Sequence, residues 1–176
     1  EKRGLLNLKS TADALPYFIS DKNVELFTRH KIFPAAEMHS RYEILMENYC
    51  KTLHIEALTM VEMIRKQILP AVLAYQNDLS ESALRKHKLG GDISCEFEMG
   101  LLQKLSGLTA SLSKKADQLD RALTEAKDFV DIKAQADFYK DTVFTLMGGT
   151  RAVADDLEVS VGESYWPYPT YGKLLF

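Results

Sequence analysis

Apolar residues recur every three or four positions along most of this chain, which is the spacing of one face of an α-helix. Pro70 interrupts the first long stretch, residues 35–88, and lacks a backbone N–H group, so we expect a kink there. The apolar stripe continues in phase beyond Pro70, which argues against an end to the helix. Its members are Met38, Tyr42, Leu45, Tyr49, Leu53, Ala57, Met60, Ile64, Ile68, Val72 and Tyr75.

Two further stretches show the same helical spacing. Residues 93–130 place Leu101, Leu105, Leu108, Leu112, Ala116, Leu119, Leu123, Ala126 and Val130 on a seam of the kind found in bundles. Residues 133–161 carry Ala136, Tyr139, Val143, Met147, Val153, Leu157 and Val161. Gly148 and Gly149 each weaken this third helix by about 1 kcal/mol relative to alanine, so either it bends there or another backbone approaches closely. Residues 34–161 therefore predict an all-α fold, an antiparallel bundle of long helices.

The two ends of the chain differ from the helical middle. Residues 1–33 and 162–176 are expected to form irregular straps. Within the first, Pro16 favours an extended conformation for Leu15–Ile19, and Ser20 is expected to begin a short helix containing Val24 and Phe27. The first strap also contains an apolar opening, which is expected to be poorly ordered, or buried against another copy, when this chain stands alone. Its residues are Leu5, Leu6, Leu8, Leu15, Tyr17, Phe18 and Ile19. The aromatic, proline-containing second strap should dock on another surface, because exposed apolar area is costly in water.

Composition narrows the class of protein. The 176 residues are 46% hydrophobic and 27% charged, with a net charge of −3. This balance is typical of one globular domain and gives no electrostatic attraction to nucleic acid. No stretch contains the roughly 18 consecutive apolar residues that span a membrane. Cys50 and Cys95 lie outside any CxxC motif, so we expect free thiols in a reducing cytoplasm.

The sequence contains no recognisable catalytic, metal-binding or phosphate-binding motif. Several pairs share a helix face and are candidate sites: His39 with Glu43, Cys50 with His54, Asp117 with Asp120, and Asp155 with Glu158. The two acidic pairs could hold a cation, but solvated surface carboxylates are the favoured interpretation. Ser106, Ser111 and Ser113 have no nearby base to activate them. We therefore expect no catalytic, cofactor-binding or metal-binding residue in this chain.

Six segments are more particular than generic helical sequence and resemble type III glutamine synthetase. They are Leu5–Pro16, Lys22–Phe27, Glu37–Glu43, Lys51–Ala57, Ile68–Ala71 and Tyr165–Phe176. The resemblance implies an enzyme that joins glutamate to ammonia at the expense of ATP, using Mg²⁺ held by carboxylates that lie upstream of these segments. This chain then corresponds to a non-catalytic C-terminal helical domain with a structural or assembly role. The resemblance further implies that residues 1–33 follow or pack on the catalytic barrel of the same polypeptide, and that the parent enzyme is a homo-oligomer.

One alternative belongs to a different class, a stand-alone helical-bundle adaptor or sensor that binds a partner helix or a small ligand. A groove between the first two helical stretches would support this alternative. A metal-carrying bundle ranks third. The apolar straps at both ends favour the interpretation that this chain is a domain of a larger protein over that of a stand-alone adaptor.

Overall fold

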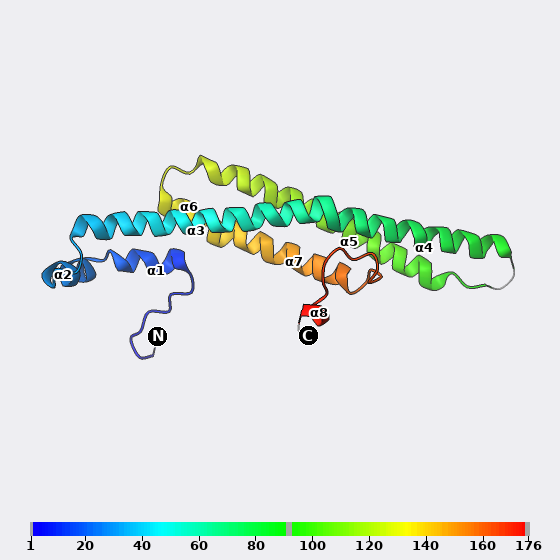
Figure 1. Cartoon of the computed structure of the whole chain (residues 1–176), viewed down its shortest axis with the longest axis horizontal. Helices are drawn as coiled ribbons and strands as arrows, with labels where there is room; N and C mark the ends of the chain where they lie inside the picture. The colour runs from blue at the N-terminus through cyan, green and yellow to red at the C-terminus, as the bar shows by residue number, and fades with distance from the viewer. Residues whose placement is uncertain (1, 91–92, 175–176) are drawn as a thin grey trace. The chain divides into compact units, whose positions relative to one another are not determined.

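The computed structural model of this chain describes residues 2–90 and 93–174. Its α-helices are α1 (Thr11–Phe18), α2 (Asp21–Arg29), α3 (Ala35–Met63), α4 (Leu69–Leu89), α5 (Glu96–Glu125), α6 (Ile132–Phe138), α7 (Phe144–Glu158) and α8 (Tyr171–Leu174) (Figure 1). Two π-turns, η1 (Ile64–Ile68) and η3 (Tyr139–Val143), and the 3-10 turn η2 (Ala126–Asp128) continue these helices. The described residues contain no β-strand, so the all-α prediction is confirmed. Within the same residues, no helix is both long and apolar enough to cross a lipid bilayer.

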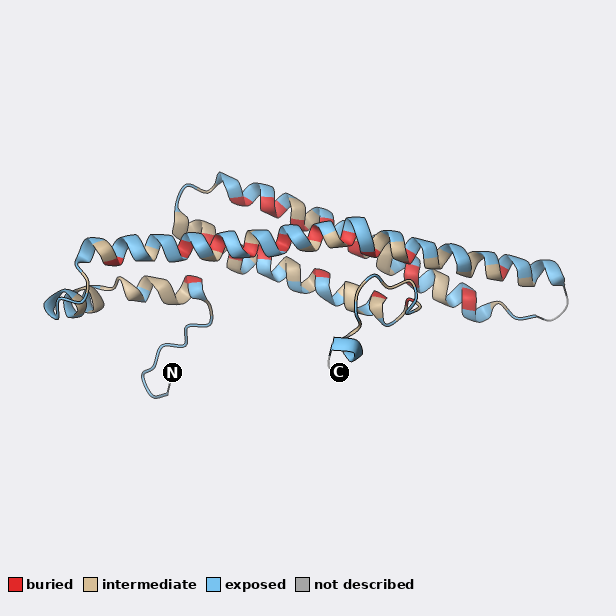
Figure 2. Ribbon diagram, viewed as in Figure 1, coloured by how far each residue is buried: buried red, intermediate tan, exposed pale blue. Residues whose placement is uncertain are grey.

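The chain divides into two compact units. Unit 1 comprises residues 1–57 and 122–145, and unit 2 comprises residues 58–121 and 146–176. The long helices α3 and α5 each contribute residues to both units. Along these helices the buried residues, red in Figure 2, are spaced with the helical period that the sequence predicts.

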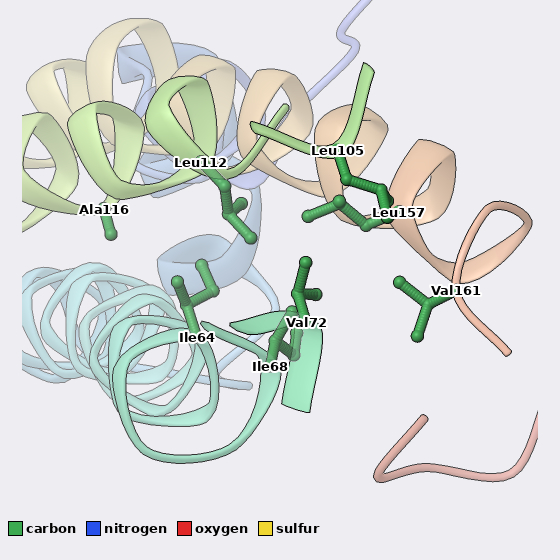
Figure 3. Close-up of a cluster of buried hydrophobic side chains, with 8 residues drawn as sticks. All are labelled: Ile64, Ile68, Val72, Leu105, Leu112, Ala116, Leu157 and Val161. Atoms are coloured by element: carbon green, nitrogen blue, oxygen red, sulfur yellow. The ribbon is translucent and has the colours of Figure 1, made fainter. Parts of the chain in front are cut away.

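Unit 2 is built on an antiparallel pair, α4 with its preceding π-turn against α5. Hydrogen bonds and ion pairs set the register: Lys86 pairs with Glu98 near the connecting turn, Gln76 with Thr109 further in, and Arg65 with Asp117 further still. Side chains of α4, η1, α5 and the α7 end meet in a common core (Figure 3). This core consists of Ile64, Ile68, Val72, Leu105, Leu112, Ala116, Leu157 and Val161.

The residues of the predicted stripes are buried or half-buried, with two exceptions. Leu45 is 45% exposed, and its neighbour Met46 takes the buried position instead. Val130 is fully exposed because α5 and η2 end at Asp128, so no helix carries the seam that far. Both errors come from extending a regular repeat past the point where packing and helix ends override it.

Pro70 lies in the first turn of α4, directly after the π-turn η1, and the helical path does not end there. The N–H of Leu69 donates to the carbonyl of Ile64, five residues back, so the hydrogen-bond ladder is already offset where proline lacks its donor. A first-turn position is also where proline is best tolerated. The prediction that the helical path does not end at Pro70 is therefore confirmed, and the expected kink stays a prediction.

Gly148 and Gly149 lie inside α7, which runs through them without ending. A Cβ atom at Gly149 would lie 3.2 Å from Nζ of Lys115, and one at Gly148 would meet nothing within 4 Å. Of the two alternatives, the close approach of another backbone is therefore not found at these glycines, since the flexible side chain of Lys115 fills the space beside Gly149. The departure from the regular α-helix falls earlier, at the π-turn η3.

The expectation of an extended Leu15–Ile19 segment is wrong, because α1 contains Pro16. Ser10 caps this helix by accepting a hydrogen bond from the N–H of Asp13 at 3.1 Å, and Ala12 is fully buried. The side-chain cap at Ser10 and the burial of Ala12 together stabilise α1 by more than it loses through the one backbone hydrogen bond that Pro16 cannot donate. The next helix, α2, forms directly after Ser20 as predicted, although the Ser20 hydroxyl donates to the Tyr17 carbonyl and caps no N–H of α2.

Candidate functional site

The acidic pair Asp117–Asp120 does hold a cation, and that cation is a guanidinium of the same chain. The two terminal nitrogens of Arg65 reach the two carboxylates, each at 2.8 Å. In the described part of the chain, His, Cys, Asp and Glu side chains form no group of three or more that could hold a metal ion. Asp155 of the second acidic pair lies 3.7 Å from Nε of Arg151. These pairs are therefore ion pairs within unit 2.

His54 is bonded across unit 1 and not to its helical neighbour. Its Nδ1 lies 2.9 Å from the hydroxyl oxygen of Tyr139, whose side chain is almost completely buried. Cys50 and His54 line one hollow of about 550 Å³ with Tyr139. Burial raises the pKa of the Cys50 thiol to about 11, so at neutral pH the sulfur is protonated and a poor nucleophile. Cys50, His54 and Tyr139 therefore contribute side-chain packing and one hydrogen bond to unit 1.

Lys140 stands among three carboxylates where η3 faces α1. Its Nζ lies 2.8 Å from Asp13, 3.6 Å from Asp137 and 3.5 Å from Asp141. The hydrogen bond to Asp13 raises the pKa of Lys140, and the same bond, helped by one from Ser10, lowers the pKa of Asp13. The sequence gives no sign of the contact with Asp13, because Asp13 lies 127 residues from Lys140 along the chain. Its effect is to anchor α1 to the rest of unit 1.

Residues of the C-terminal strap pack on the core of unit 2. Tyr165, Trp166 and Tyr168 contact its buried cluster, and the Tyr165 ring lies 5.0 Å, centre to centre, from the Tyr75 ring. The Tyr165 hydroxyl donates a hydrogen bond to Asp78. The predicted docking is therefore confirmed for these three aromatic residues, and the surface that receives them belongs to the same chain.

The first leucines of the apolar opening have no such cover among the described residues, whereas Leu15, Phe18 and Ile19 of the same opening are half-buried. Leu5 is 69% exposed, Leu6 60% and Leu8 37%, and all three lie before the first helix. Tyr17, Leu26 and Ile32, further along the same strap, are also exposed. Apolar side chains gathered in one short segment and left in water are typical of a surface that binds another body.

Comparison with known proteins gives these features a family. Residues 1–87 match the family described as the glutamine synthetase C-terminal domain. A glutamine synthetase of Butyrivibrio fibrisolvens is 43% identical over 99% of this chain, which covers 25% of that relative. The type-3 glutamine synthetase of Dictyostelium discoideum is 31% identical over the whole chain, which covers 24% of that relative. A glutamine synthetase of Bacteroides fragilis is 25% identical over 99% of the chain.

The chain spans about a quarter of the length of the curated relatives that it matches. It is a helical domain that matches their C-terminal part. Within that class, the chain belongs to the C-terminal domains of type III glutamine synthetases.

Proposed function

We propose that this chain serves as the non-catalytic structural domain of a type III glutamine synthetase, docked on the catalytic barrel of the same polypeptide through residues 1–33. The observation that carries the proposal is the exposed apolar opening of a chain that matches its relatives along nearly its whole length. Leu6 and Leu5 have 60% and 69% of their surface exposed, which is expected of an interface whose partner surface is absent.

The chemistry of the parent enzyme belongs to other parts of that polypeptide in this proposal. Glutamate, ammonia, ATP and Mg²⁺ would bind the barrel, and this chain would contribute no catalytic, cofactor-binding or metal-binding residue. The buried Cys50 thiol and the Arg65 ion pairs support a structural role for the two sites that most resemble chemistry. A homo-oligomeric parent enzyme in the cytoplasm, where free thiols persist, completes the proposal.

The first test is the intact mass of the natural gene product that carries this sequence. A mass several times 19.9 kDa supports the proposal. A mass near 19.9 kDa contradicts it and favours the stand-alone adaptor, because no barrel would then be attached.

The second test measures hydrogen exchange of the backbone amides of residues 5–8 in the natural polypeptide. Docking on a barrel predicts slow exchange of these amides, and substitution of Leu5 and Leu6 by aspartate should accelerate it. Leu174→Asp, on an exposed residue near the opposite end of the chain, is the matched control. Fast exchange of residues 5–8 in the unmodified polypeptide would contradict the docking.

The third test concerns catalysis. The 176-residue chain alone should form no glutamine from glutamate, ammonia, ATP and Mg²⁺. Turnover above a buffer control would place catalytic residues in this chain and overturn the proposal.

A further inference from the structure

A hollow of about 830 Å³, which we call the α1 hollow, lies in unit 1 beside the start of α1. Leu8 of the apolar opening lines it, and so do Tyr49 and Leu53 of α3 and Phe144, the first residue of α7. Leu53 is buried and Tyr49 is half-buried, whereas Leu8 and Phe144 are 37% and 60% exposed. The α1 hollow therefore joins the opening of the chain to apolar side chains far along the sequence.

Most of the charged groups of the α1 hollow are already paired within the chain. Nζ of Lys140 lies 2.8 Å from Asp13 and 3.5 Å from Asp141, and the Ser10 hydroxyl donates to Asp13 at 2.7 Å. Lys9 is exposed at the edge, where its ammonium group can stay in water while its stem lies on apolar surface. The groups that lack a partner in the hollow are therefore its apolar side chains.

The exposed apolar side chains here form one surface. Single exposed apolar residues are normal in soluble proteins, but Leu8, Tyr49 and Phe144 share the same hollow. Leu45 lies one turn before Tyr49 on the same side of α3 and is 45% exposed, so the surface continues along that helix. Apolar surface gathered in this way is typical of an interface.

Two observations indicate what covers this surface. Leu8 lines the α1 hollow and also belongs to the opening that the proposed function docks on the barrel. It lies two residues after Leu6, at most about 7 Å along an extended chain, so a body that covers both leucines reaches the mouth of the hollow. This chain covers only about a quarter of the length of its relatives, so a large upstream body is available in them to supply that cover.

We propose that an apolar side chain of the upstream barrel of the same polypeptide enters the α1 hollow and packs against Phe144, Tyr49 and Leu8. The barrel then contacts α3 and α7 as well as residues 1–33. The inference rests on the proposed function and deepens it, because it names the bundle surface that receives the barrel and the chemistry of the entering group. That group is apolar because Asp13, Asp141 and Lys140 already neutralise one another in pairs.

Photo-crosslinking in the natural polypeptide tests the contact. Phe144→p-benzoylphenylalanine keeps an aromatic ring at the α1 hollow and adds a group that bonds to nearby C–H groups on illumination. A mixture of unlabelled and heavy-nitrogen-labelled chains distinguishes crosslinks within one polypeptide from those between copies. The expected product joins residue 144 to a peptide upstream of residue 1 in the same polypeptide. Phe97→p-benzoylphenylalanine is the matched control, because Phe97 is 74% exposed in unit 2 and should give such a product in much lower yield.

A second pair of variants tests whether the Phe144 ring contributes to docking. In the natural polypeptide, Phe144→Asp should accelerate hydrogen exchange of the backbone amides of residues 5–8 by about tenfold or more, because the covering body loses an apolar contact. Thr145→Asp is the control and should leave that exchange unchanged, since Thr145 is the next exposed residue of α7 and does not line the hollow. Both variants place the same charge at an exposed position, so both should fold.

Crosslinks from residue 144 that stay within residues 1–176, or that join two copies, would overturn the proposal. Equal yields of the upstream product from residues 144 and 97 would overturn it too, as would unchanged exchange of residues 5–8 in Phe144→Asp. The proposed function is decided separately, by the mass of the gene product and by the exchange of residues 5–8 in the unmodified polypeptide. Slow exchange there without the crosslink from residue 144 would uphold the docking of the opening and reject the contact at the α1 hollow.

Discussion

Lys140 and Asp13 lie 127 residues apart in the sequence, yet Nζ of the lysine is 2.8 Å from a carboxylate oxygen of the aspartate. The contact joins the π-turn η3 to α1, the helix that follows the exposed apolar opening. It also places a cation at the point where Ser10 and Asp13 cap α1. The first helix of the chain thus depends on a residue in the C-terminal half of the sequence.

Stability should depend on pH through Asp13. The pKa of its carboxyl group is lowered in the folded chain, chiefly by Lys140, so its stabilising effect is complete above the ordinary value of 3.8 and is lost as the pH falls through the lowered value. The protection of the amides of residues 11–18, taken relative to their intrinsic exchange rate at the same pH, should therefore fall in acid, and Asp13→Asn should show low protection already at neutral pH. Glu62→Gln, which breaks an exposed ion pair with Lys66, should leave exchange of these residues unchanged.

Leu112→Asp should destabilise unit 2 by about 4 kcal/mol or more, because it buries a carboxylate in an apolar core without a partner. Leu112 is fully buried there. A large fall in melting temperature, followed by circular dichroism, is the expected result. Ala110→Asp, on the exposed side of the same helix, should change the melting temperature little. Equal melting of the two variants would show that the assigned helix face is wrong.

The strap on unit 2 can be followed through Trp166, the single tryptophan of the sequence. Its indole nitrogen is buried, so the folded chain should emit at short wavelength and resist quenching by iodide. Tyr165→Ala removes the ring contact with Tyr75 and the hydrogen bond to Asp78, and should cost about 1–3 kcal/mol of docking free energy. We expect a red-shifted, more readily quenched emission. Tyr17→Ala, at a tyrosine that is 43% exposed in unit 1, should change neither.

The two cysteines should react at very different rates with iodoacetamide. Cys50 is 4% exposed and the pKa of its thiol is raised to about 11, whereas Cys95 is only partly buried. Peptide mapping after a short reaction at pH 8 should find the label on Cys95 alone, with Cys50 labelled only after denaturation. Equal labelling of both residues in the folded chain would contradict the burial of Cys50.

The helical middle of the fold could be predicted because period and burial agree there. Leu105, Leu112 and Leu119 recur every seven residues and all three are fully buried. The ends of helices were harder, since Val130 continues the repeat but lies past the end of α5. The expectation that Pro16 makes Leu15–Ile19 extended was wrong, because the cap at Ser10 and the burial of Ala12 stabilise the helix α1.

The contacts between distant residues could not be predicted from the sequence. Asp117 and Asp120 were visible as a pair, but their cation, Arg65, comes from a helix more than fifty residues away. The Tyr139 partner of His54 likewise follows from how helices pack, which periodicity does not specify. A hollow of about 900 Å³, lined by residues of α4 and α5 such as Leu73, Asn77 and Gln103, lies between the first two helical stretches, where the adaptor alternative expects a groove. Its lining follows from the register of the two helices and contains no local sequence motif.

The two π-turns are places where the chain can change its length by one residue without changing a helix face. A π-turn holds one residue more than the α-helical turn it replaces, so deleting a residue from 64–68 or 139–143 would restore a regular helix and leave the later side chains on the same face. A deletion within the regular turns of α3 or α5 would instead rotate every later side chain of that helix by about 100°. In an alignment of relatives, a one-residue gap should therefore be tolerated at these turns and rare within the regular helices.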